Sequence, residues 1–326
     1  MATINDVAIK ANVSVTTVSR VLNNRGYISE ATRTKVYKTM EELNYQPNEI
    51  ARSLLRKQSN VIGLIIPSVS HPFFSELANH VENYAYELGF KLLLCNSQLD
   101  PYKEKDYIEM LKRNRVDGII MGSHTLQVDE YKSLSSPIVT IDRQISKEIP
   151  YISSDNRAGG SLAAELLVQK GCKKIAHICG NLELQMLANQ RTEAFQAVML
   201  EHGIEHMIIQ TDMNVFDQLQ YEQIMHQLFQ DHPDIDGIFA TSDIIAAFAV
   251  KECLAAGRRV PGDVKIIGYD DVNAAKWITP ELTTVKQPIE EIGKAAVDLI
   301  IKQLNKEAFE TENTFPVTLI ERASTK

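Results

Sequence analysis

The chain has 326 residues, of which 34 are Lys or Arg and 42 are Asp or Glu, giving a formal net charge of −8. Hydrophobic residues make up 44% and charged residues 23%, a balance that excludes an intrinsically disordered chain and a collagen-like fibre. No apolar run approaches the roughly 18 residues of a membrane helix, and the N-terminal MATINDVAIK lacks the basic and apolar regions of a secretory signal. We therefore expect a cytoplasmic protein with no membrane contact.

The charge is unevenly distributed along the chain. Residues 1–60 carry +4, and the remaining 266 residues carry −12. A small basic segment on an acidic body indicates that only the N-terminal part meets a polyanion.

The first 45 residues show apolar residues at helical spacing and no strand pattern. Three helical faces are formed by Val7, Ala8 and Ala11, by Val18, Val21 and Leu22, and by Val36, Met40 and Leu43. Asn12 tolerates the left-handed conformation that ends a helix, and Ser14 and Ser29 are suitable N-caps for the second and third helices. The pattern predicts an all-α helix-turn-helix head over residues 1–46.

A basic segment over residues 47–59 follows the head, beginning at Pro47 and containing two adjacent leucines. Pro suits the first turn of a helix, but so short a helix is marginal alone in water. We expect it to become ordered only against a partner.

From residue 61 apolar runs alternate with amphipathic helices. The runs occupy residues 61–67, 91–96, 118–122, 138–141, 175–179, 238–240 and 264–269. A Gly just past a helix, followed by a strand, recurs at Gly89, Gly171, Gly203 and Gly257, and such passages are typical of parallel sheets. Because some 260 residues exceed one doubly wound sheet, we predict two similar α/β lobes that bind ligands at the carboxyl ends of their strands.

The second helix of the head carries residues suited to reading DNA. Its sequence VTTVSRVLNN leaves Val15, Thr16, Ser19, Arg20 and Asn23 facing outward or near its N-terminus. Reading the major groove requires side chains at the start of such a helix, and Arg binds guanine through two hydrogen bonds. The alternative is a solvated helical subdomain with no nucleic-acid role.

The whole chain resembles the LacI/GalR family of bacterial transcription repressors. The head carries TINDVAIKANVSVTTVSRVLNNRGYISEATRTKVYKTMEELNYQPNEIARSL, and the body carries SHPFFSEL, VDGII, SSDN, ATSD, IIGYDD and LTTVKQP. Within the family, GYISEATR, LLCNSQLDPYKEKDYIEML and VDGIIMGSH look most like sucrose operon repressors of Gram-positive bacteria. The resemblance implies a hinge helix and linker over 47–59 and a two-lobed core, similar to periplasmic binding proteins, over 60–326. The N-lobe would comprise about 60–156 and 287–317, and the C-lobe about 157–286 and 318–326.

The resemblance also implies which residues contact DNA. Val15, Thr16 and Arg20 match positions that contact base edges, and Val15 would act by apolar contact with a thymine methyl. Phosphate-contacting positions are matched by Thr3, Ser14, Asn23, Tyr45 and Asn48, and these fix register more than sequence. Ala51 and Leu54 match hinge residues that enter the minor groove, where paired leucines wedge a base step. The alternative for Leu54 is packing against its own body domain, and Asn12 departs from the usual family Gly.

The effector site is implied in the same way. The matching positions are Phe73, Phe74, Asp155, Arg191, Phe216, Ser242 and Asp270. The phenylalanines would give an apolar wall for a sugar face, although one of them can instead belong to the lobe core. Carboxylates and an arginine suit a polyhydroxyl ligand because they pair with hydroxyl groups. Ser242 stands where Asn is common, Asp271 is interpreted as structural, and Ser123 is a weaker polar candidate.

The sequence offers little support for an enzyme or a metal site. The sequence has no Gly-rich phosphate loop, no GxSxG and no HExxH. We interpret His202 and His206 as solvated loop residues and the four cysteines as buried structural thiols, and we expect no catalysis, metal or cofactor.

These observations predict a homodimeric, nucleoid-associated repressor of a carbohydrate operon, and of a sucrose operon in particular. It would bind pseudo-palindromic double-stranded operator DNA and be released by a sugar or sugar-phosphate effector between its lobes. Four alternatives stay open: a catabolite-control regulator with a phosphorylated carrier protein as corepressor, a purine-type regulator with a corepressor, a sugar-binding transport protein and a sugar-processing enzyme.

Overall fold

The structure is a computed structural model and describes residues 2–46, 58–123, 125, 136–184, 186–211 and 218–326. Contacts divide the chain into two compact units, residues 1–59 and residues 60–326. None of the described helices is long and apolar enough to cross a membrane.

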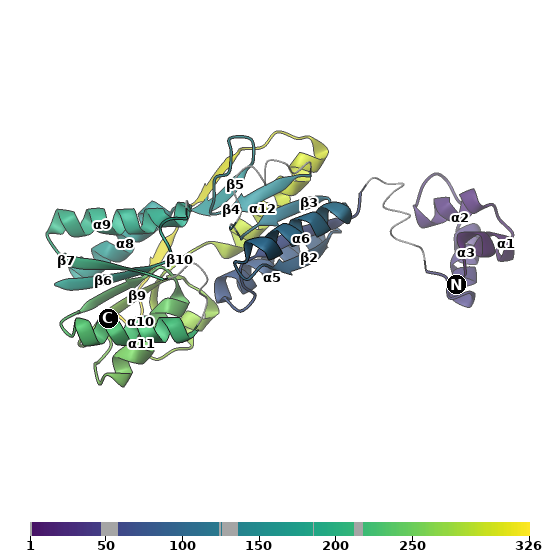
Figure 1. The fold of residues 1–326 in the computed structure, drawn as a ribbon. Coiled ribbons are helices and arrows are strands. Elements are labelled where there is room, and N and C mark those ends of the chain that lie inside the picture. Colours follow the sequence, from purple (N-terminus) through teal and green to yellow (C-terminus); the bar gives the residue numbers. More distant parts are fainter. Residues whose placement is uncertain (1, 47–57, 124, 126–135, 185, 212–217) are drawn as a thin grey trace. The chain divides into compact units, whose positions relative to one another are not determined.

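Residues 2–46, the described part of the N-terminal unit that precedes the linker, form the helices α1 (Ile4–Lys10), α2 (Val15–Leu22) and α3 (Glu30–Glu42) (Figure 1). The expected caps are confirmed, because Ser14 Oγ accepts a hydrogen bond from the Thr17 N–H at 3.0 Å and Ser29 caps α3 in the same way. Asn12 has the left-handed φ of 49° that the sharp turn between α1 and α2 requires. The small core consists of Val7, Ala8, Ala11, Val18, Val21 and Val36.

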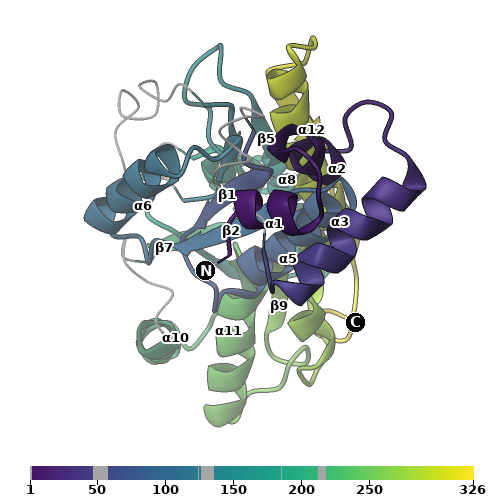
Figure 2. The same ribbon diagram turned by 90° about the vertical axis from the view of Figure 1, so that its right-hand side faces the viewer.

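The described residues of the second unit form two six-stranded sheets, and we call the first sheet with its helices the N-lobe (Figures 1 and 2). Its strands are β1 (Val61–Ile66), β2 (Lys91–Asn96), β3 (Gly118–Met121), β4 (Ile138–Ile141), β5 (Tyr151–Ser154) and β11 (Glu312–Phe315). They lie in the order β11-β5-β4-β3-β1-β2, and all neighbours are parallel. One face packs on α5 (Pro72–Glu87) and α12 (Ile289–Asn305), and the other on α6 (Pro101–Arg113).

The second sheet with its helices forms the C-lobe. Its strands are β6 (Lys174–Cys179), β7 (Glu205–Gln210), β8 (Gly237–Ala240), β9 (Lys265–Asp270), β10 (Thr283–Lys286) and β12 (Thr318–Ile320), in the order β12-β10-β9-β8-β6-β7. One face packs on α8 (Asn156–Gln169) and α9 (Gln190–His202), and the other on α10 (Gln218–Asp231) and α11 (Asp243–Ala255). Two short helices, η1 (Leu187–Asn189) and η2 (Asn273–Lys276), complete the described elements.

The predicted fold class is confirmed, with one difference in strand direction. Gly89, Gly171, Gly203 and Gly257 all have φ between 64° and 84°, as helix-ending glycines do. The edge strand β12, however, pairs antiparallel with β10, because the chain re-enters the C-lobe directly from β11 without an intervening helix. All four cysteines are buried thiols as expected, and burial raises the pKa of each to about 11.

Candidate functional site

The outward face of α2 presents the residues expected to read bases. Val15 is 40% exposed, and Thr16 and Arg20 are exposed along the same helix. Val18 and Val21 on the opposite face are buried in the core of the head. The side chains of the first turns of α2 are therefore available to a partner such as a DNA groove.

The residues expected to contact phosphates also have structural roles in the head. Thr3 caps α1 in a reciprocal capping box with Asp6, and Ser14 caps α2. The Asn23 Nδ2 donates to the Ser19 carbonyl at 2.8 Å, and Tyr45 packs against the core of the head. Caps at helix N-termini bring backbone N–H groups to the surface, where a phosphate binds well. Asn48, Ala51, Leu54 and Phe216 lie outside the described residues.

A cavity of about 260 Å³ lies between the two lobes. It opens where strands of both sheets end, since Ser123 follows β3, Asp142 follows β4 and Ser242 follows β8. Binding at the carboxyl ends of strands is the general rule for open α/β sheets. The lining residues are Pro67, His71, Phe73, Phe74, Leu99, Gly122, Ser123, Ile141, Asp142, 179–182, Leu184, Met186, Ala188, Asn189, Arg191, Thr192, Thr211, Tyr221, Thr241, Ser242, Ile245, Asp270 and Gln287.

Aromatic rings form an apolar part of the cavity wall. The Phe73 and Phe74 rings meet edge to face with centroids 5.1 Å apart, and His71 lies 5.4 Å from Phe74. Phe73 is 9% exposed and belongs to the N-lobe core, while Phe74 is only partly buried. Both therefore line the cavity, with Phe73 also serving as core, and the apolar face of a sugar ring fits such a wall.

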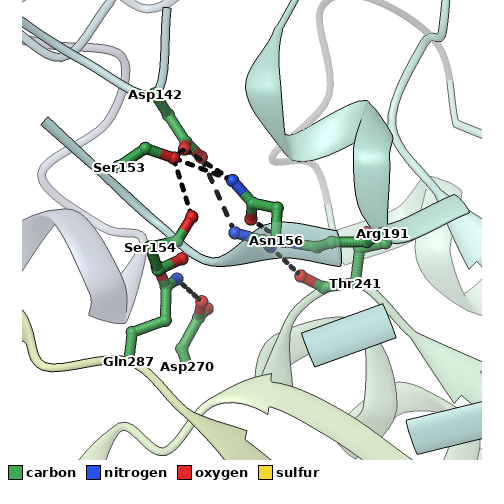
Figure 3. A network of polar contacts seen from close by, with 8 residues as sticks. All are labelled: Asp142, Ser153, Ser154, Asn156, Arg191, Thr241, Asp270 and Gln287. Carbon is green, nitrogen blue, oxygen red and sulfur yellow. Dashed lines mark hydrogen bonds and ion pairs between the residues drawn. The ribbon is translucent and has the colours of Figure 1, made fainter. Parts of the chain in front are cut away.

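Arg191 is the main cationic group in the cavity, and its guanidinium is held from several sides (Figure 3). Its Nε donates to Asn156 Oδ1 at 2.6 Å, and Nη1 donates to the Thr241 carbonyl at 3.0 Å. Its Nη2 lies 3.6 Å from the Asp142 carboxylate, which belongs to the N-lobe. The Cζ atom also lies 3.6 Å above the Tyr269 ring. These contacts fix the guanidinium before any ligand arrives.

A second set of hydrogen bonds, at the cavity wall, links residues of the two sheets (Figure 3). The Gln287 Nε2 donates to Asp270 Oδ1 at 2.6 Å, and Ser154 Oγ donates to Gln287 Oε1 at 2.7 Å. Burial raises the pKa of Asp270 to about 7, against the opposing effects of Arg191 and Gln287. Burial and the Asp270 charge also raise the pKa of the adjacent Asp243 well above its usual range. The site thus holds acids whose charge is costly without a partner.

Asp155, expected to contact an effector, is not among the residues that line the cavity. Its Oδ1 accepts a hydrogen bond from the Ala158 N–H at 2.9 Å and thereby caps α8. Ser242 lines the cavity and also caps α11. Ser123 lines it as well, but its hydroxyl donates to buried Glu104 at 2.6 Å. Asp271 forms an ion pair with Arg322, in keeping with its structural interpretation.

Sequence reasoning missed three polar residues that line the cavity, namely Asp142, Thr192 and Gln287, and also Asn156, which holds the Arg191 guanidinium. A signal for Asp142 existed, because it directly follows a buried strand, as Asp270 ends one. The interpretation of the two histidines as loop residues was wrong: His202 ends α9 and His206 lies in β7. Within the described ranges, no cluster of three or more His, Cys, Asp and Glu side chains could hold a metal ion.

Comparisons with known proteins relate both units to regulators. A family model described as bacterial regulatory proteins, lacI family, matches residues 3–48, and a periplasmic binding protein-like domain matches residues 164–325. The chain is 42% identical to a ribose operon repressor of Halalkalibacterium halodurans, over 100% of this chain and 98% of that one. It is 40% identical to a sucrose operon repressor of Streptococcus mutans, over 98% of each. A crystal structure of the lac repressor dimer bound to operator and the anti-inducer ONPF aligns with a TM-score of 0.86 and 27% identity, over 99% of both chains.

Proposed function

The chain belongs to the lacI family of bacterial regulatory proteins and is a transcriptional repressor, and we propose that a small unphosphorylated sugar, bound between its lobes, controls its affinity for operator DNA. The homodimer would place one head on each half of a pseudo-palindromic site. Arg20, Thr16 and Val15 would read base edges there, while Thr3, Ser14, Asn23, Tyr45 and Asn48 would hold phosphates. Ala51 and Leu54 would enter the minor groove between the half-sites.

The charges of the residues that line the cavity favour an unphosphorylated ligand. Asp142 is a carboxylate, Asp270 with its pKa of about 7 is ionised in part of the molecules at neutral pH, and the guanidinium of Arg191 is already bonded to protein acceptors. A phosphate group brings about two further negative charges at neutral pH and would meet like charges in a water-poor site. A polyhydroxyl ligand can instead donate to the carboxylates and accept from the arginine.

The size of the cavity favours one sugar ring. Its volume of about 260 Å³ lies just below the range of roughly 300–1,000 Å³ that is usual for drug-sized ligands. Ribose represents this class, and a ribose operon repressor is among the relatives. Sucrose, the effector and operon suggested by the sequence, is the second candidate because a sucrose operon repressor is nearly as similar.

The sugar would act by shifting the population of lobe arrangements. The Arg191–Asp142 contact and the Asp270–Gln287–Ser154 hydrogen bonds join the two lobes across the cavity. A ligand that replaces or adds to these contacts favours one arrangement of the lobes. The resulting movement of the N-lobes in the dimer would change the positions of the two hinge segments. By reciprocity, operator DNA must change the affinity for the sugar by the same factor.

Calorimetry on the full-length protein tests the proposal with ribose, fructose, sucrose, ribose 5-phosphate and guanine. We expect ribose or fructose to bind and to weaken operator binding in a gel-shift assay, and Arg191→Ala to abolish both effects while leaving DNA binding intact. Binding of sucrose alone would transfer the proposal to the two-ring candidate. Binding of only the phosphate or the purine, or a ligand that strengthens operator binding, would refute it in favour of a corepressor.

A further inference from the structure

Thr192 lines the cavity, and its hydroxyl is tied to a histidine behind it. His177 of β6 is fully buried, and its ring packs against those of Phe195 and Phe239 in a cluster, with centroid distances of 4.8 and 4.7 Å from His177 and 6.0 Å between the two phenylalanines. Its Nδ1 lies 3.0 Å from the Phe239 carbonyl oxygen, and its Nε2 lies 2.9 Å from Thr192 Oγ1. Thr192 itself is 3% exposed. Both ring nitrogens are therefore engaged.

The partners of the ring decide where its proton lies. A carbonyl oxygen can only accept, so Nδ1 must carry hydrogen and donate to Phe239. A neutral ring then has a lone pair on Nε2, which can only accept. The Thr192 hydroxyl consequently donates to Nε2, and its own hydrogen points away from the cavity.

The surroundings of His177 keep the ring neutral. The residue has no exposed surface and packs against two aromatic rings, and Arg191 lies close enough for its charge to disfavour a second cation. Burial, together with Arg191, lowers the pKa of His177 to about 3. The tautomer is thus fixed over the whole physiological pH range.

We propose that His177 is a positioning residue that makes Thr192 a pure hydrogen-bond acceptor in the cavity, so that the protein selects a ligand with a hydroxyl group at this point. The inference rests on the proposed function, since it concerns the same sugar site. A ligand with an ether or carbonyl oxygen there would place two acceptors face to face, and a deoxy ligand would leave the Thr192 lone pair with only the weak Cys179 thiol as a donor.

The thiol of Cys179 forms a side-chain hydrogen bond with Thr192. Cys179 lines the cavity beside Thr192, and burial raises its pKa to about 11, so the thiol stays protonated. A thiol is a weak donor. A sugar hydroxyl would therefore replace it with a net gain.

Nitrogen NMR of protein labelled with ¹⁵N-histidine tests the tautomer without any ligand. We expect His177 Nδ1 to be protonated and Nε2 to be unprotonated, with no change between pH 5 and pH 8. Thr192→Val should shift the Nε2 signal, whereas Thr211→Val, which changes another buried threonine of the cavity, should not. A protonated Nε2 overturns the inference whatever the ligand is.

Binding assays with ribose, its monodeoxy analogues and its O-methyl analogues test the selectivity. The wild type should reject one deoxy analogue and the corresponding O-methyl sugar by about ten-fold or more. Thr192→Val should bind ribose about ten-fold more weakly and lose this discrimination, and Thr192→Ser should restore it. His177→Asn retains a donor for the Phe239 carbonyl but has no Nε2, and it should also lose the discrimination without touching the sugar.

The outcomes separate the two proposals. If the wild type binds ribose and Thr192→Val discriminates among the analogues as well as the wild type does, the inference is refuted and the sugar site stands. If no sugar binds the wild type, the proposed function and the hydroxyl selectivity fall together, while the NMR result still decides whether His177 orients Thr192.

Discussion

Replacement of Gly160 by alanine should distort the cavity by displacing the backbone of Arg191. Gly160 lies in α8, where a Cβ atom would stand 2.3 Å from the Arg191 carbonyl oxygen and 2.8 Å from the Arg191 Cα. Because non-bonded atoms settle at about 3.5–4 Å, α9 would have to move by about 1 Å. The atoms in conflict belong to the backbone, so no side-chain rotation relieves the overlap.

Two opposing effects decide the stability of Gly160→Ala. Alanine is favoured over glycine inside a helix by about 1 kcal/mol. Overpacking of a tight contact costs about 1–3 kcal/mol and more where backbone must move. We expect the overlap to win, with a net loss of about 2 kcal/mol and a fall in Tm of about 5 °C.

The ligand site should suffer more than the fold. A shift of about 1 Å at Arg191 breaks the 2.6 Å bond to Asn156 and the 3.0 Å bond to Thr241. Sugar affinity should therefore fall by at least about ten-fold, the cost of one or two lost hydrogen bonds. The head and the core are separate compact units, so operator binding should be retained while its response to sugar is lost.

Thermal unfolding, sugar calorimetry and operator gel shifts measure these three effects. Gly293→Ala in α12 is the matched control, because its Cβ would stand 3.1 Å from the Cβ of the His80 side chain and needs only a small adjustment. That variant should keep its sugar affinity. A Gly160→Ala protein as stable as the wild type and with unchanged sugar affinity would refute the reasoning.

Three further predictions concern DNA and pH. Arg20→Ala should cost about 1–3 kcal/mol of discrimination at one base pair, whereas Tyr45→Phe should weaken binding to operator and random duplexes alike. If gel shifts show that Arg20→Ala loses the same affinity for both duplexes, Arg20 does not read a base. Leu54→Ala should reduce the operator bend measured by fluorescence energy transfer, and an unchanged bend would remove Leu54 from the wedge role. Because the pKa of Asp270 is raised to about 7 in the folded state, folding takes up protons between about pH 4 and pH 7, and the free energy of unfolding should fall as pH rises through that window. Asp270→Asn should flatten this slope in denaturant titrations at pH 5 and pH 8, and an equally steep slope would contradict the assignment.

The head was predictable because its signals are local. Ser14 and Ser29 are caps next to the helices that they start, and Asn12 marks the turn within a few residues of both helices. The apolar strands of the core were predictable for a similar reason, since buried parallel strands read as short continuous apolar runs.

Several strands gave no such signal. β10 contains Thr283 and Thr284, which are fully buried although polar. Thr283 Oγ1 donates to the Arg322 carbonyl, and Thr284 Oγ1 donates to Asp243. Their burial depends on partners that are dozens of residues away, and a scan for apolar runs cannot see these. The same holds for the cavity, because Gln287 and Ser154 are far apart in the sequence and come into contact only in the folded protein.

Two of the strand ends next to the cavity have an unusual backbone conformation. Asp142, Asp270 and Asp271 have φ values of 61°, 114° and 57°, which residues other than glycine seldom adopt. Such conformations cost about 1–3 kcal/mol each, and the burial of Asp270 adds a desolvation cost that apolar residues would avoid. Stability alone would not favour strain and buried charge at the ends of β4 and β9. These costs are explained if the two strand ends hold carboxylates in position for a ligand. A rigid pattern of hydrogen-bond donors and acceptors loses less entropy on binding than a flexible one.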